Sequence, residues 1–141
     1  MHYTTMCLDE QEEDVNSNPG NIGLWDCNGS DNQIWSEKTI TANPTSEAKN
    51  LASHRSGKCA TYRPGDYGTP AGIWLAPCGQ DGQGWTRISG GDTYMFEAAQ
   101  VPGMCMSATA QPVTIGSYAG YIGIELRSCA TTSPLKDWRQ Y

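Results

Sequence analysis

The sequence predicts a single all-β domain assembled from three repeats, and two observations carry this prediction. A pair of cysteines followed by a tryptophan occurs three times along the 141 residues, and the second cysteines are evenly spaced, at Cys27, Cys78 and Cys129. Sixteen glycines and eight prolines interrupt the chain every few residues, and no segment shows a helical period. Each repeat of this length is one small structural unit that buries its apolar face against its neighbours.

The length of the chain and the spacing of the repeats define its organisation. A chain of 141 residues has the size of one domain and can bury a core of its own. We expect one domain over residues 1–141, with repeats at about 1–46, 47–90 and 91–141. No apolar run approaches the roughly eighteen residues of a membrane span. Because no charged-then-apolar leader follows Met1, we expect a mature or excised domain with an added initiator.

The first repeat carries the fullest version of the pattern. It reads Cys7-Leu8-Asp9, then Gly23-Leu24-Trp25-Asp26-Cys27, then Asn32-Gln33-Ile34-Trp35. Alternating or short apolar runs between turn residues predict strands at Leu24–Trp25 and Ile34–Trp35, with a shortened opening strand within His2–Met6. We expect the acidic run 9–14 to be a solvated loop, since the alternative, a calcium loop, lacks the spacing and glycine of an EF-hand.

The second and third repeats keep the frame with other residues. The second reads Cys59-Ala60-Thr61, then Ile73-Trp74-Leu75-Ala76-Pro77-Cys78, then Gly82-Gln83-Gly84-Trp85. The third reads Cys105-Met106-Ser107, then Ile124-Glu125-Leu126-Arg127-Ser128-Cys129, then Leu135-Lys136-Asp137-Trp138. Here the clearest predicted strands are Ile73–Leu75, Tyr94–Phe96 and Ile122–Leu126.

Together the three copies resemble the ricin B-type lectins, including the family-13 carbohydrate-binding modules. Repeats of that family carry a Cys-x-Asp, an aromatic residue two positions before the second cysteine, and a Gln-x-Trp. The resemblance covers nearly the whole chain. It implies a β-trefoil with threefold pseudosymmetry and a domain that binds carbohydrate.

Six cysteines allow many pairings, and the sequence by itself does not choose among them. If the three repeats are built alike, each pair closes inside its own repeat. The expected disulfides are Cys7–Cys27, Cys59–Cys78 and Cys105–Cys129. No C-x-x-C is present, so we expect neither a zinc site nor any other metal. Three disulfides indicate an oxidising compartment, and therefore a secreted or extracellular protein.

Tryptophans divide into two groups by their positions in the repeats. Each repeat ends on one: Trp35, Trp85 and Trp138. Equal placement indicates large rings that fill the core. Trp25 differs, because the other repeats have Ala76 and Arg127 at its position, so the fold requires no aromatic there. We interpret Trp25 as an exposed platform, whereas Trp74, one position away, is either buried or a separate contact, and we favour burial.

The first repeat contains a set of side chains suited to a sugar. An aromatic ring covers the apolar face of a pyranose, a carboxylate accepts hydrogen bonds from two neighbouring hydroxyls, and an amide adds one donor and one acceptor. Trp25, Asp9 and Asn32 supply these groups. The resemblance assigns the same three positions to a galactoside site, which implies that Gln33 braces the site and that Asn28 flanks it.

The other two repeats have lost this set. At the matching positions the second has Thr61, Ala76 and Gly82, and the third has Ser107, Arg127 and Leu135. None of these groups can hold a pair of hydroxyls as a carboxylate does. We therefore expect a single sugar site, in the first repeat, and two repeats that serve the fold alone.

Composition and motifs exclude several other functions. Nine basic against fifteen acidic residues give a net charge of −6, which argues against binding to nucleic acid. The histidines are His2 and His54, and no G-x-S-x-G, H-E-x-x-H or P-loop occurs. Counting alone does not exclude a glycosidase carboxylate pair within 9–14. We nevertheless expect a protein that is not an enzyme and needs no cofactor.

The sequence therefore predicts a lectin module for galactose or N-acetylgalactosamine. The resemblance implies that such a module targets a larger secreted protein, with a catalytic or toxin domain elsewhere in the parent chain. The alternative is a β-trefoil that has lost sugar binding and acts as a protein-interaction or inhibitory scaffold. The intact Asp9, Trp25 and Asn32 favour the first hypothesis, because drift would have eroded this set as well.

Overall fold

The computed structural model describes residues 2–3, 6–10, 22–43, 45–63, 72–90, 93–109, 113–115 and 118–130. Regular structure in these segments consists of β-strands, apart from one short 3₁₀ turn, η2 (Asp31–Gln33). The described segments contain no helix that is long and apolar enough to cross a membrane. The predicted all-β class is confirmed.

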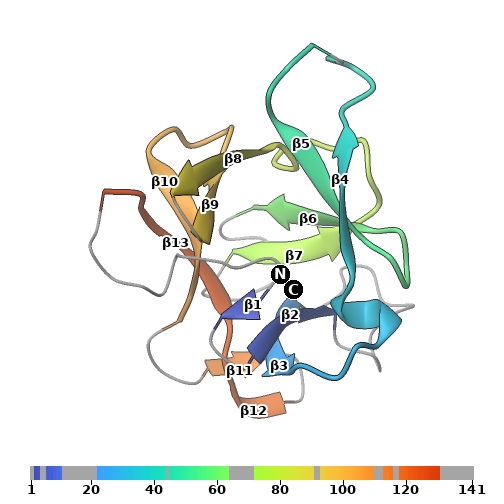
Figure 1. Ribbon diagram of the computed structural model, residues 1–141, viewed down its shortest axis with the longest axis vertical. Coiled ribbons are helices and arrows are strands. Elements are labelled where there is room, and N and C mark those ends of the chain that lie inside the picture. The colour runs from blue at the N-terminus through green and yellow to red at the C-terminus, as the bar shows by residue number, and fades with distance from the viewer. Residues whose placement is uncertain are drawn as a thin grey trace.

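The strands occur along the chain in the order of the three repeats (Figure 1). They are β1 (His2–Tyr3), β2 (Met6–Glu10), β3 (Ile22–Asp26), β4 (Trp35–Thr39), β5 (Lys49–Ser53), β6 (Cys59–Tyr62), β7 (Ile73–Ala76), β8 (Trp85–Gly90), β9 (Thr93–Ala98), β10 (Met104–Ala108), β11 (Val113–Ile115), β12 (Tyr118–Tyr121) and β13 (Ile124–Ser128). The sheets run β1-β2-β3, β13-β10-β9-β8-β5-β6-β7 with β4 beside β5, and β11-β12.

Three antiparallel pairs repeat the same local arrangement. They are β2–β3, β6–β7 and β10–β13, which lie at the bottom, in the centre and at the left of Figure 1. In each pair the residue after the first cysteine faces a leucine: Leu8 faces Leu24, Ala60 faces Leu75 and Met106 faces Leu126. Since the register is the same three times, the repeats read from the sequence are structural repeats.

A disulfide joins the first strand of each pair to a cysteine that lies just after the second strand. The bonds are Cys7–Cys27, Cys59–Cys78 and Cys105–Cys129, with Cα–Cα distances of 5.0, 5.1 and 5.1 Å. The predicted pairing within repeats is confirmed. In the chain-entropy account each bridge limits the unfolded chain and stabilises the fold by about 3 kcal/mol.

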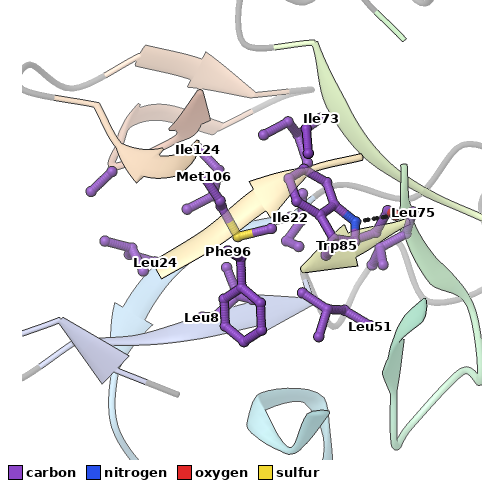
Figure 2. Packing of buried hydrophobic residues seen from close by; sticks show 13 residues of the cluster. Leu8, Ile22, Leu24, Leu51, Ile73, Leu75, Trp85, Phe96, Met106 and Ile124 are labelled. Carbon is purple, nitrogen blue, oxygen red and sulfur yellow. Dashed lines mark hydrogen bonds between the residues drawn. The ribbon is translucent and has the colours of Figure 1, made fainter. Parts of the chain in front are cut away.

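The core contains apolar side chains from all three repeats (Figure 2). Side chains alternate along each strand, so every second residue points inward. Figure 2 shows Leu8, Leu51, Phe96 and Met106 pointing toward one another from different strands. The cluster is continuous between repeats, so each repeat buries its apolar face against the other two.

The closing tryptophans belong to this core to different extents. Trp85 is fully buried and its Nε1–H donates to the Ala60 carbonyl at 3.0 Å. Trp35 is half-buried against the core, and its Nε1–H donates to the matching carbonyl, Leu8 O, at 2.9 Å. The prediction is confirmed for Trp85 and in part for Trp35, while Trp138 lies outside the described residues.

Two predictions about individual segments are wrong. The acidic run was expected to form a solvated loop, yet Asp9 and Glu10 end strand β2 and are 4% and 0% exposed. Their burial follows from hydrogen bonds with distant side chains, described below; residues 11–14 lie outside the described segments. The strand predicted from Ile122 begins at Ile124, since Ile122 forms only an isolated bridge to Leu24.

Candidate functional site

The β2–β3 hairpin separates its core face from the face that carries the candidate site. Leu8 and Leu24 are paired and point into the core, with exposures of 0% and 1%. Asp9 is paired with Gly23, and side chains two residues apart on a strand share a face, so Trp25 lies on the face of Asp9. Trp25 is 52% exposed. The hairpin thus brings the predicted carboxylate and the predicted aromatic platform to one surface.

The Asp9 carboxylate is bound by two amide side chains from turn η2. Asn32 Nδ2 donates to Asp9 Oδ2 at 3.1 Å, and Gln33 Nε2 donates to the same oxygen at 2.9 Å. All three side chains are buried, so these charge-assisted bonds act in a low local dielectric. We call Asp9, Asn32 and Gln33 the carboxylate–amide cluster; it fixes the orientation of the carboxylate.

Gln33 uses both ends of its amide to hold the loop before η2. Its Nε2 also donates to Asp26 O at 2.9 Å, and its Oε1 accepts from Asn28 N at 2.9 Å. Asn28 Oδ1 in turn accepts from Ser30 N at 2.9 Å, which makes an Asx turn, and the Asn28 side chain is exposed. The geometry therefore gives Gln33 a bracing role and Asn28 a role in the turn beside the cluster.

Glu10 belongs to the surroundings of the site, and sequence reasoning missed it. Asn32 Nδ2, besides bonding Asp9, donates to the main-chain oxygen of Glu10 at 3.0 Å. The Glu10 carboxylate accepts hydrogen bonds from Ser53 and Ser56 in the second repeat. One signal could have revealed it: the aligned positions are Tyr62 and Ala108, so an acid stands where the other repeats have apolar or aromatic residues.

The second repeat keeps the frame of the cluster without its charge. Gln83 Nε2 donates to Thr61 Oγ1 at 3.0 Å and to Pro77 O at 2.9 Å, as Gln33 does in the first repeat. Trp74 pairs with Thr61 across the strands, at the position that Gly23 has beside Asp9. Its exposure is 4%, so the predicted burial of Trp74 is confirmed. The buried Trp74 indole thus lies beside Thr61, whereas the glycine in the first repeat places no side chain beside Asp9.

The second repeat has Gly82 where the first has Asn32, so it lacks the amide at that position. Gly82 has φ +80°, a conformation that favours glycine. A Cβ built there would lie 2.3 Å from the Tyr62 carbonyl oxygen. No side chain therefore fits at this position, and the second repeat cannot present the polar set of the first.

The third repeat is described only in its strands. Ser107, which aligns with Asp9, is buried and its hydroxyl donates to Ala108 O at 3.1 Å. Arg127, which aligns with Trp25, binds Glu125 on its own strand, with Nε to Oε1 at 2.8 Å. Leu135 lies outside the described residues. The described part of this repeat offers no aromatic platform beside a carboxylate.

A broad hollow lies away from the β2–β3 hairpin. It measures about 860 Å³ and lies between the β4–β5 loop, residues 78–84 and residues 99–100. Its lining includes Asn50, Asp81 and Gln100 but, among the described residues, no aromatic side chain. Volume alone therefore does not locate the site, since a platform and an oriented carboxylate occur together only on the β2–β3 hairpin in the described part of the chain.

Comparison with known families identifies the family of the chain as a whole. Residues 1–138 match the model of the ricin-type β-trefoil lectin domain. The chain belongs to this family. The predicted resemblance is confirmed, and the fold of this ricin-type lectin domain is a β-trefoil.

Solved structures show the same fold at low identity. A designed threefold-symmetric protein, ThreeFoil, superposes with a TM-score of 0.72 at 19% identity, covering 95% of this chain and 89% of that one. A mosquitocidal holotoxin gives 0.71 at 12% identity, covering 97% of this chain and 16% of the toxin. A Polyporus squamosus lectin, bound to the epitope Neu5Aca2-6Galb1-4GlcNAc, gives 0.65 at 11% identity, covering 97% and 44%. No curated protein matches the sequence.

This chain is shorter than two of the proteins with the same fold. This chain spans 16% of the holotoxin and 44% of the fungal lectin, so in both the equivalent fold is one part of a longer polypeptide. Identities of 11% to 19% establish the fold alone. The residues of the β2–β3 hairpin and turn η2 are therefore the features of this chain that bear on a ligand.

Proposed function

We propose that this lectin domain binds galactose or N-acetylgalactosamine at one site, in the first repeat. The observation that carries the proposal is the buried Asp9 carboxylate, held by Asn32 and Gln33 on the same hairpin face as the half-exposed ring of Trp25. The apolar face of the sugar ring stacks on Trp25. Two neighbouring hydroxyls donate to Asp9, and Asn32 supplies the amide.

The burial of the cluster supports this division of roles. Asp9 is 4% exposed whereas Trp25 is 52% exposed, so the carboxylate forms the base of the site and the indole forms its wall. Hydrogen bonds to a carboxylate are stronger where water is scarce. Because Asn32 and Gln33 hold the acid before the ligand arrives, little side-chain entropy remains to be lost on binding.

We further propose that the domain is secreted and targets a larger protein to glycan-bearing surfaces. Three disulfides are typical of oxidising compartments. The similarity to one segment of a holotoxin supports a parent chain with a toxin or catalytic part, while the domain itself is not an enzyme.

Retention on immobilised galactose tests the proposal. We expect the protein to be retained and to elute with free galactose, and to pass unretarded through the same matrix carrying glucose. Passage through the galactose matrix without delay would contradict the proposal. It would favour the alternative function as a protein-interaction or inhibitory scaffold. The second repeat, with its buried Trp74 and with Gly82, already lacks the polar set that a sugar requires.

A further inference from the structure

Glu10 is a fully buried acid held by the neighbouring repeat. Its exposure is 0%, and it lies 43 positions before the first of its partners. Ser53 Oγ donates to Oε1 at 3.0 Å, and Ser56 Oγ donates to Oε2 at 2.5 Å. Burying a carboxylate is costly unless it receives hydrogen bonds, and the two hydroxyls supply them.

The turn between β5 and β6 is organised around this carboxylate. Each serine oxygen that donates its proton to Glu10 also accepts a main-chain N–H two residues later. Arg55 N donates to Ser53 Oγ at 3.2 Å, and Lys58 N donates to Ser56 Oγ at 3.1 Å. A hydroxyl has one donor and two acceptor positions, so both serines serve the turn and the acid together.

The same residue and the same turn are tied to the carboxylate–amide cluster. Glu10 O accepts from Asn32 Nδ2 at 3.0 Å. His54 N, inside the turn, donates to Ile34 O at 2.8 Å, directly after η2. The hydrogen bonds form a closed path from Asn32 through Glu10 and the serines to the turn, and from His54 back to the end of η2.

The fold does not require an acid at this position. Glu10, Tyr62 and Ala108 occupy the same place in the three hairpins, and each pairs with an isoleucine: Ile22, Ile73 and Ile124. Tyr62 and Ala108 pack against or within the core. A buried acid is therefore confined, in the described hairpins, to the repeat that has Asp9, Trp25 and Asn32.

We propose that Glu10 is a positioning residue for the sugar site. Its carboxylate anchors the end of β2 to the second repeat, and its main-chain oxygen then holds the Asn32 amide between Glu10 and Asp9. The turn of the second repeat thus supports the site of the first. This inference rests on the proposed function and adds to it a residue that does not touch the ligand.

The experiment compares four variants of the whole chain. Glu10→Ala removes the anchor, Glu10→Gln keeps its shape and acceptor, and Ser56→Ala removes one donor. Ser46→Ala is the matched control, because Ser46 Oγ also accepts a main-chain N–H two residues later, from Ala48 at 3.1 Å, but makes no bond to Glu10. The readouts are the galactose dissociation constant, the melting temperature, and the Asn32 side-chain NH₂ resonances of the free protein by ¹H–¹⁵N NMR.

We expect Glu10→Ala and Ser56→Ala to shift the Asn32 NH₂ resonances and to weaken galactose binding by about tenfold, as when a hydrogen bond to a charged group is lost. Glu10→Gln should recover most of the affinity, and Ser46→Ala should match the wild type in both readouts. A lower melting temperature with unchanged Asn32 resonances and unchanged affinity would overturn the proposal and leave Glu10 a purely structural residue.

The Asn32 readout separates the two proposals. If the wild type does not bind galactose, the proposed function fails and with it the role of Glu10 in binding. Shifted Asn32 resonances in Glu10→Ala would then still establish the coupling between the two repeats.

Discussion

Trp25 and Trp85 show how the surroundings decide the role of one residue type. Trp85 has 0% exposure, and its N–H is bound to Ala60 O, so both its apolar and its polar parts are satisfied inside the fold. Trp25 is 52% exposed on the face of the hairpin that points away from the core. An exposed ring adds little to stability but offers an apolar surface to a ligand.

The two tryptophans should therefore respond differently to truncation. We expect Trp85→Ala to lower the free energy of unfolding by about 3–5 kcal/mol, as is usual for a buried tryptophan. Trp25→Ala should change it by less than about 1 kcal/mol, because substitutions at the surface cost little. Urea denaturation of both variants measures this, and an equal loss in the two would show that Trp25 is also part of the core.

Strands β4, β8 and β9 are linked by a charged and aromatic array outside the site. Arg87 Nη1 lies 3.7 Å from Glu37 Oε2, and the Arg87 guanidinium lies 5.3 Å from the centre of the Tyr94 ring. Tyr94 meets Phe96 edge-on, with ring centres 5.3 Å apart, which connects the array to the core. The array ties β4, at the end of the first repeat, to the β8–β9 hairpin.

This array makes stability depend on pH in the alkaline range. Burial raises the pKa of the Tyr94 hydroxyl above 10.0, against the opposing effect of Arg87 and with a smaller contribution from Glu37. The folded protein therefore keeps a proton that the unfolded chain releases near pH 10, so stability falls as pH rises above about 10. We expect Tyr94→Phe to lose less stability than the wild type between about pH 8 and about pH 11. Parallel pH profiles from chemical denaturation of the two proteins would contradict this.

The local pattern predicted the all-β class and the three repeats, because each repeat carries the same motif at the same spacing. Three features occur in every repeat: a cysteine pair, an apolar residue after the first cysteine (Cys7, Cys59 or Cys105), and a closing tryptophan. A coincidence of all three features in each repeat is an improbable explanation of the pattern. The pattern could not predict Glu10, whose partners Ser53 and Ser56 lie in another repeat. A run of acidic residues normally indicates a solvated loop. Whether such residues are buried depends on tertiary contacts, which the local sequence does not show.

The candidate site was predictable in its members but not in its connections. The sequence and the family resemblance predict Asp9, Asn32 and Gln33 as members of the site, and the amide nitrogens of Asn32 and Gln33 lie 3.1 and 2.9 Å from Asp9 Oδ2. The sequence favoured burial of Trp74, but it could not show that Trp74 pairs with Thr61, or that a Cβ at Gly82 would meet Tyr62 O. Both facts depend on how closely the second hairpin packs.

The whole molecule combines a pseudosymmetric scaffold with one candidate site that contains a carboxylate, among the residues that the structure describes. Three disulfides and three hairpins repeat, whereas the carboxylate–amide cluster occurs once in the described chain. A shallow site for one or two sugar rings has few contacts, so we expect a dissociation constant near ~1 mM, about −4 kcal/mol. Lectins with several sites overcome weak binding by avidity, which a monomer with one site lacks. The isolated domain should therefore bind galactosides without agglutinating cells.

Calorimetric titration with galactose tests this account most directly, using the wild type, Asp9→Ala, Trp25→Ala and Thr61→Ala. Thr61 is the matched control, because it occupies the position of Asp9 in the second repeat and binds Gln83 as Asp9 binds Gln33. We expect one site per chain, loss of most affinity in Asp9→Ala and Trp25→Ala with the fold retained, and wild-type binding in Thr61→Ala. A stoichiometry of two or three, or unchanged affinity in both first-repeat variants, would contradict it.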